Sequence, residues 1–63
     1  MINSSQYKEV FFVFNCNNNN YISDSGITRD LHKVKYMSET KAVDIAYELG
    51  NEWGVGSCLI ETN

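Results

Sequence analysis

The chain has 63 residues, of which 43% are hydrophobic and 21% charged, a balance that predicts one folded domain spanning residues 1–63 and excludes a disordered chain or a second domain. Eight acidic residues against five basic ones give a formal charge of −3, which argues against general binding to phosphate backbones but leaves room for a local basic patch. Two cysteines, Cys16 and Cys58, are too few for a disulfide-dense secreted scaffold, so we expect reduced thiols in a cytoplasm.

The start of the chain lacks the basic and apolar stretches of a signal peptide, so no export signal is expected. The longest apolar run, residues 10–14, is far shorter than the ~20 residues of a membrane-spanning helix, which predicts a soluble protein. Domains of this size commonly gain stability from disulfides, a metal or a second subunit. Oligomerisation is the favoured route here, and a homodimer is its simplest form.

Tyr7–Asn15 reads as a β-strand, because β-branched and aromatic residues dominate it and no breaker interrupts it. Successive side chains of a strand point to opposite faces. Phe11 and Val13 therefore share one face, and residues 10, 12 and 14 share the other. Both faces are apolar, whereas one helix in a chain of this length can cover only one of them.

Residues 16–20 predict a hairpin loop, because asparagine tolerates the left-handed backbone conformations of tight connections. Residues 21–24 follow as a plausible second strand, which ends where Gly26 can supply a positive φ angle. Residues 27–33 are ambiguous. Residues 34–37 alternate well enough to predict a short third strand.

The surest prediction is a helix over Glu39–Leu49. Ser38 is a good N-cap, and Glu39 beside it complements the helix dipole. Gly50 stands where a glycine commonly ends a helix. Four apolar residues at the spacing i, i+3, i+4 and i+7 form one face of this helix: Ala42, Ile45, Ala46 and Leu49.

Trp53–Glu61 reads as a final strand, in which Gly54 and Gly56 suggest a bulge or a close backbone approach. The predicted order is β-β-(β)-α-β. We therefore expect an α+β domain with one helix packed on one face of a small antiparallel or mixed sheet of three to four strands.

The residues do not predict an enzyme. His32 is the only histidine, and neither Cys16 nor Cys58 stands in a recognisable nucleophile motif. There is no C-x-x-C and no paired histidine, so no metal site is expected, and no cofactor motif is present. Asp44 and Glu48 share a helix face, where such a pair is usually solvated.

A local basic patch is the first candidate binding site. Tyr21 and Tyr36 lie close to it in the sequence, and positive charge beside aromatic rings often holds single-stranded RNA or DNA. The alternative is a solvated loop that Asp24 and Asp30 partly balance. The patch consists of Arg29, His32, Lys33 and Lys35.

The uncovered sheet face is the second candidate. Exposed apolar patches mark interfaces, and tyrosine, tryptophan and arginine supply most binding hot spots. The N-terminal arm or a strongly curled sheet would cover these rings internally instead, and the residues leave that alternative open. The predicted protein interface consists of Phe11, Val13, Tyr21, Tyr36 and Trp53.

The sequence from residue 21 to residue 49 resembles the short ββαβ early proteins of tailed, T-even-like phages. Residues 21–27, then Asp30 and Leu31, then residues 35–39 leading into the helix carry this resemblance. Many such proteins bind and disable a host enzyme or defence protein, so the resemblance implies a host-takeover or anti-defence role in the bacterial cytoplasm. It transfers no site residue to this chain.

Three functions therefore stand as hypotheses. The leading one is a non-enzymatic module that binds and inhibits a host protein, such as a toxin, nuclease or polymerase, through its aromatic sheet face or its acidic helix face. The alternative is a small protein that binds RNA or single-stranded DNA through the basic patch. The third is a small enzyme that relies on Cys58 or His32.

Overall fold

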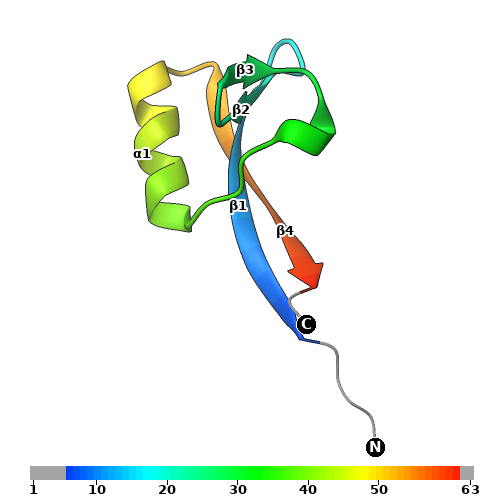
Figure 1. Ribbon diagram of the computed structural model, residues 1–63. Helices are drawn as coiled ribbons and strands as arrows, with labels where there is room; N and C mark the ends of the chain where they lie inside the picture. Colours follow the sequence, from blue (N-terminus) through cyan, green and yellow to red (C-terminus); the bar gives the residue numbers. More distant parts are fainter. Residues whose placement is uncertain (1–5, 62–63) are drawn as a thin grey trace, which may run out of the picture.

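The computed structural model describes residues 6–61, which form a four-stranded antiparallel sheet with one helix on one face (Figure 1). The order of strands in the sheet is β3-β2-β1-β4. The predicted α+β class and the single helix are confirmed. In chain order the elements are β1 (Tyr7–Asn15), β2 (Tyr21–Ser23), β3 (Gly26–Thr28), the 3-10 turn η1 (Leu31–Lys33), α1 (Glu39–Leu49) and β4 (Trp53–Glu61). Within this part of the chain, no helix has the length and apolar character needed to cross a membrane.

The longest feature of the sheet is the ribbon of β1 and β4. The two strands pair without interruption from Tyr7 opposite Glu61 to Asn15 opposite Trp53, so the predicted bulge at the β4 glycines is wrong. The other alternative predicted at these glycines was a close approach of backbone. Aromatic rings, and not backbone, approach them closely. A Cβ atom on Gly56 would lie only 2.5 Å from Cζ of Phe12, which shows that this ring lies across the glycine.

The helix begins and ends where the sequence predicts. The Ser38 hydroxyl accepts a hydrogen bond from the Lys41 N–H at 3.3 Å, as expected of an N-cap. Gly50 adopts φ 116°, and its N–H donates to the Ala46 carbonyl at 3.1 Å. Both predicted caps are confirmed.

The core lies between α1 and the ribbon. Val13 is 0% exposed, and it packs beneath Ala42 and Ala46 of the helix. Phe11 and Trp53 are half-buried against this cluster. The prediction that these sheet residues lie on the uncovered face is therefore wrong for Val13, Phe11 and Trp53. The two alanines let the helix backbone approach the sheet closely, and this fit places the Val13 side of β1 under the helix.

The third strand is not where the sequence predicts it. β3 comes directly after a two-residue turn, and Gly26 adopts φ 123° at its start. Residues 34–37 instead cross from one strand to another. The Lys35 N–H donates to the Ile22 carbonyl of β2 at 2.9 Å, and Met37 exchanges two backbone hydrogen bonds with Phe11 of β1. This segment thus fills the gap that opens beside β1 where the short β2 ends.

The predicted hairpin loop between β1 and β2 is confirmed. Asn19 there adopts φ 55°, the left-handed conformation that asparagine tolerates. The Asn15 side chain is buried, and its carbonyl oxygen accepts from the Asn17 N–H at 2.8 Å. These contacts fix the start of the loop relative to the end of β1.

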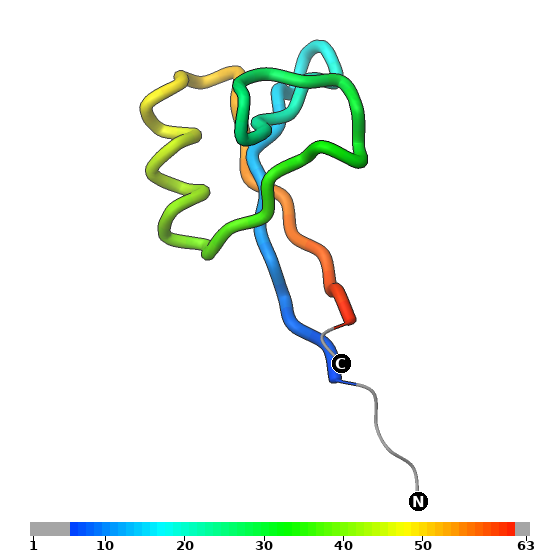
Figure 2. The backbone as a smooth tube through the Cα atoms, viewed as in Figure 1, coloured from blue at the N-terminus to red at the C-terminus, as the bar shows by residue number. Residues whose placement is uncertain are grey.

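The open end of the ribbon extends past the helix (Figure 2). Tyr7 is 59% exposed and Leu59 65% exposed, although both lie on the same face as the helix-covered residues Phe11 and Val13. Nothing in the described part of the chain packs over this end as α1 packs over the other.

Candidate functional site

Four rings gather on the sheet face opposite the helix, and we call them the aromatic face. Phe12 lies at the centre, with its ring centroid 6.1 Å from those of Phe14 and Tyr21 and 6.2 Å from that of Tyr36. The Tyr36 ring stands nearly perpendicular to the Phe12 ring, at 83°. Ring centroids 4.5–7 Å apart in tilted or edge-on arrangements stabilise each other. The alternation of β1 produces this face, because Phe12 and Phe14 point away from Val13.

The chain itself covers part of the aromatic face. Leu31 of η1 and Val34 lie over it, and together with three of the rings they enclose a hollow of about 200 Å³. The cover is incomplete, because Leu31 is 63% exposed and Tyr36 45% exposed. The N-terminal arm, which the sequence left as a possible cover, falls mostly outside the described residues.

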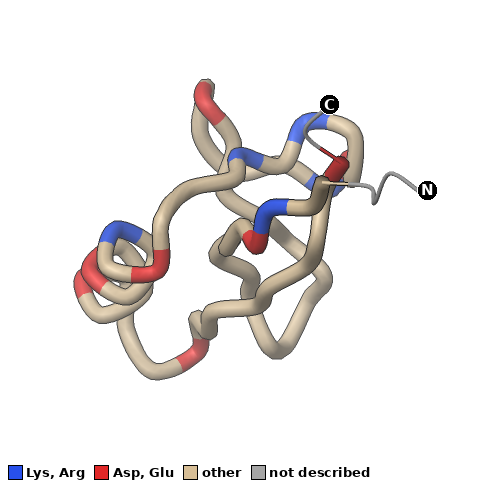
Figure 3. Tube along the Cα trace, turned by 90° about the horizontal axis from the view of Figure 1, so that it is seen from below, with Lys and Arg blue, Asp and Glu red and all other residues tan. Residues whose placement is uncertain are grey.

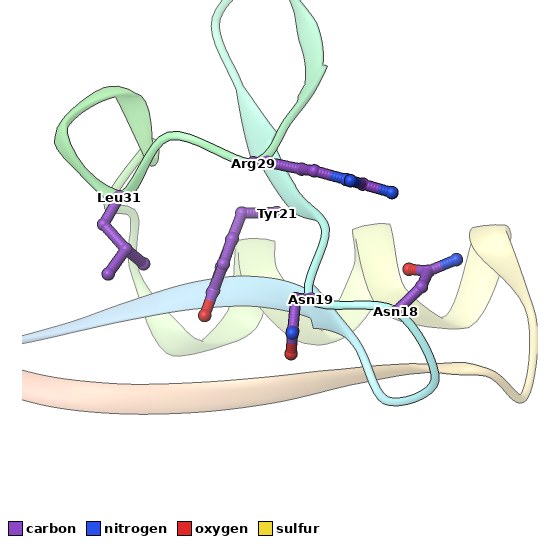
Figure 4. Close-up of a pocket in the computed structure, with 5 residues that line it drawn as sticks. All are labelled: Asn18, Asn19, Tyr21, Arg29 and Leu31. Carbon is purple, nitrogen blue, oxygen red and sulfur yellow. The ribbon is translucent and has the colours of Figure 1, made fainter.

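A larger and more open hollow of about 660 Å³ adjoins the first. Figure 4 shows Leu31, Tyr21 and Asn19 projecting in the same direction, while Arg29 extends toward Asn18. Tyr21 and Leu31 line both hollows, so the two share part of their walls. The hollow thus combines an aromatic ring, an aliphatic side chain, a guanidinium group and two amides.

A hydrogen bond helps to position the Arg29 side chain in this hollow. The Arg29 Nε–H donates to the Asn20 side-chain oxygen at 3.3 Å. Asn20 is held next to β1, because its carbonyl accepts from the Asn15 N–H at 2.8 Å. Within residues 6–61 the other guanidinium N–H groups make no hydrogen bond, so they can meet a carboxylate or phosphate, which arginine binds well.

The predicted basic patch does not converge on one site. Of its four members, Arg29 alone lines the hollow beside Tyr21. Lys35 pairs with Asp24 across 3.1 Å, although both side chains are too exposed for this to stabilise the fold much. His32 and Lys33 lie exposed on η1, where the Asp30 carboxylate accepts from the His32 backbone N–H at 2.9 Å.

Charge nevertheless differs between the two sides of the molecule. Residues 21–37 carry three basic and two acidic side chains, a formal charge of +1, whereas residues 39–52 carry one basic and four acidic side chains, a formal charge of −3. Figure 3 shows acidic residues along the helix and basic residues along the segment that precedes it. The aromatic face is therefore flanked by the less negative part of the chain.

Cys58 borders the aromatic face and does not lie in the core beneath the helix. It stands opposite Val10 in the ribbon and is half-buried. Partial burial raises the pKa of Tyr36, and the charge and hydrogen bond of the neighbouring Cys58 thiol raise it further. Cys16 is exposed in the hairpin loop, and neither thiol forms a disulfide.

No group of three or more histidine, cysteine or carboxylate side chains comes together within residues 6–61 in a way that could hold a metal ion.

Comparisons with protein-family models, curated proteins and solved structures found no match. The function therefore has to be inferred from the side chains of this chain.

Sequence reasoning identified Tyr21, Tyr36 and Arg29 at this surface but missed Phe12, Phe14 and Leu31. A usable signal existed for the two phenylalanines. They recur at i and i+2 in one strand, and Gly54 and Gly56 recur at i and i+2 in the other. Aromatic rings commonly lie over glycines on neighbouring strands, so this pattern indicates that the rings share one face with the glycines.

Proposed function

We propose that this chain is a non-enzymatic binding module that holds a partner protein against the aromatic face and the hollow beside Arg29. The observation that supports this most directly is the half-covered ring cluster, which lies next to an open hollow of about 660 Å³. Tyrosine and arginine are the residues that most often supply binding energy at protein interfaces, typically in pockets near the centre of the contact.

The wider role rests on the resemblance to phage early proteins and stays a prediction. Binding would block the activity of a host enzyme or defence factor in the bacterial cytoplasm. The hollow suits a partner that inserts an acidic or aromatic side chain, because a guanidinium and a tyrosine ring there can meet a carboxylate or a second ring.

Affinity capture from a bacterial lysate, with and without nuclease treatment, tests the proposal when paired with two variants. Leu31→Glu places a charge at the mouth of both hollows, and because Leu31 is 63% exposed the fold should tolerate it. Ile27→Glu is the matched control, since it introduces the same charge at an apolar residue that is 60% exposed and lines neither hollow. Bound proteins are quantified by mass spectrometry.

We expect to capture a protein whose binding survives nuclease treatment. The Ile27→Glu variant should retain it, whereas the Leu31→Glu variant should lose at least about tenfold in capture, the equivalent of 1.4 kcal/mol of binding free energy. Equal capture by the Leu31→Glu variant would remove the aromatic face from the binding site. Circular dichroism of both variants checks that the fold is intact.

A second candidate is a single-stranded nucleic acid. The observation that favours it is the placement of Arg29 beside the Tyr21 ring and two asparagine amides, since stacking and phosphate contact commonly occur together. At most three cations of this segment would meet phosphates, so the slope of log K against log salt would be about −2. Affinity for a short labelled RNA should then fall by up to about 20-fold between 50 and 200 mM salt. A flat response, or one that Arg29→Gln leaves unchanged, contradicts this candidate.

A further inference from the structure

β4 is an edge strand with an unusually bare edge. It is last in the sheet order, and within residues 6–61 no strand pairs with its outer side. Natural edge strands are commonly protected by charged residues, prolines or bulges. None of these interrupts β4 from Trp53 to Ile60, and its pairing with β1 is regular over all nine residues. Apart from the Trp53 N–H, which donates to the Gly50 carbonyl at 3.1 Å, the edge is thus available for pairing with another strand.

A groove runs alongside the first half of this edge. Side chains from the helix and residues of β4 enclose about 380 Å³ there. Tyr47 and Val43 on its helix side are 85% and 50% exposed. The groove opens beside β4 and not beside β1, because its strand residues are Trp53, Gly54 and Val55.

The second half of the edge has the opposite character. No helix covers it, and Leu59 and Ile60 are 65% and 37% exposed. Leu59 follows Val55 by four residues in the strand, so both side chains point to the same face. One end of β4 therefore offers an apolar groove, and the other end offers apolar side chains without a cover.

We propose that two copies of this chain pair β4 with β4 in antiparallel orientation about a twofold axis at Ser57, and so form a continuous eight-stranded sheet. Ser57 is the midpoint of Trp53–Glu61, so this register alone aligns all nine residues of both strands, with the Trp53 N–H left on the Gly50 carbonyl. It also places both helices on the same side of the sheet, because residues directly opposite each other in a ladder point to the same face.

In this register, the uncovered apolar half of each β4 strand lies against the half of the partner's β4 strand that borders the groove. Leu59 comes to lie beside the partner's Val55, at the opening of the partner's groove. On the other face, Ile60 stands opposite the partner's Gly54, and Cys58 stands opposite the partner's Gly56, so each side chain meets an aromatic ring that lies over that glycine. The sole charged residue of the strand, Glu61, stands opposite the partner's Trp53, so no like charges face each other.

A second copy fits this edge better than an unrelated strand, because the two complementary halves belong to the same sequence. The small core gives a further reason for association. Its buried hydrophobic residues, among those described, are two valines and two alanines: Val10, Val13, Ala42 and Ala46. Domains of this size often rely on a second subunit. The proposal does not rest on the proposed function, which uses the sheet face and not its edge.

Sedimentation equilibrium of the full chain from about 1 to 100 µM measures the association, since mass action makes a dimer depend on concentration. We expect a mass twice that of the 7.2 kDa chain at the upper end. Leu59→Lys places a charge where Leu59 meets the partner's Val55, two residues from the axis, and should give a monomer. Ile27→Lys is the matched control, because Ile27 is 60% exposed on β3, at the opposite edge of the sheet, and should leave the dimer intact.

A crosslink tests the register itself. Directly opposite residues of an antiparallel pair have Cα atoms about 4.5–5.5 Å apart, which is within reach of a disulfide. Ser57→Cys in a Cys16→Ser, Cys58→Ser background should therefore form an interchain disulfide on mild oxidation, whereas Ile27→Cys in the same background should not. This measurement decides the matter if Leu59→Lys fails to fold.

Three results would overturn the proposal. They are a wild-type chain that remains monomeric over the whole concentration range, a dimer that the folded Leu59→Lys variant retains, and equal crosslinking at positions 57 and 27. A chain that remains monomeric but binds a β-strand of another protein at this edge would likewise overturn the proposal.

Discussion

Replacing Gly56 by alanine should destabilise the protein, because the added methyl group meets the ring at the centre of the aromatic face. The new Cβ would lie 2.5, 2.9 and 3.1 Å from three carbons of Phe12, whereas ordinary contacts begin at 3.4 Å. The ring must therefore move by roughly 1 Å, and its contacts with Tyr21 and Tyr36 oppose that movement.

The magnitude follows from two opposing effects. Overpacking of this kind costs about 1–3 kcal/mol. Replacing glycine by alanine in a strand stabilises by about 0.5–1 kcal/mol. The net loss of unfolding free energy should lie between about 0 and 2.5 kcal/mol, with its centre near 1 kcal/mol, which urea denaturation followed by circular dichroism can resolve.

Gly54→Ala is the matched control on the same face of the same strand. Its Cβ would lie 3.3 Å from Cζ of Phe14 and 3.4 Å from Sγ of Cys16, so only a small adjustment is needed. We expect a change within about 0.5 kcal/mol of zero, since the gain and the crowding nearly cancel.

A double-mutant cycle with Phe12→Leu identifies the cause. The shorter side chain removes the ring that the new methyl group meets, so Gly56→Ala should destabilise the Phe12→Leu protein by less than it destabilises the wild type. Equal losses at Gly54 and Gly56, or additive effects in the cycle, would refute the reasoning.

Two further predictions concern the core and the tyrosine at the edge of the aromatic face. Val13→Ala should lower the unfolding free energy by about 2–3 kcal/mol, from about 1.6 kcal/mol of lost transfer free energy and a cavity, in urea denaturation. Val43→Ala, at a 50% exposed position, should cost clearly less. Because its pKa is raised in the folded state, Tyr36 keeps its proton there at pH values where the unfolded chain has lost it. Stability should therefore decline as the pH rises above about 10, and less so in the Tyr36→Phe variant.

The parts of the fold that the sequence predicted are those with long, regular patterns. Nine residues rich in β-branched and aromatic side chains predicted β1, the spacing of four apolar residues predicted the helix, and Ser38 and Gly50 predicted its caps. β3 was missed because three residues are too few to show a period. Residues 34–37 alternate like a strand, but they pair with two different strands through single bridges.

The choice of which sheet face the helix covers was beyond the sequence pattern, because both faces of β1 are apolar. Packing decides it. Ala42 and Ala46 leave room for Val13 beneath the helix, whereas on the other face the rings of Phe12 and Phe14 occupy the space above two glycines. A helix packed on that side would have to displace those rings. This is why Phe11 and Trp53, predicted as interface residues, lie beneath the helix, while Tyr21 and Tyr36 remain at the open face.

Pairing at the β4 edge would increase the affinity of the aromatic face for a partner that has two binding sites. The twofold axis at Ser57 stands perpendicular to the sheet, so it places both helices on one side and both aromatic faces on the other. A partner that is itself dimeric, or a strand of nucleic acid, could then contact two identical sites at once. Linked sites of this kind raise the overall affinity well above that of either site alone, provided that the spacing allows simultaneous contact. Leu59→Lys, which lies far from Arg29 in the sheet order, should then weaken capture of such a partner without altering the affinity of a single site.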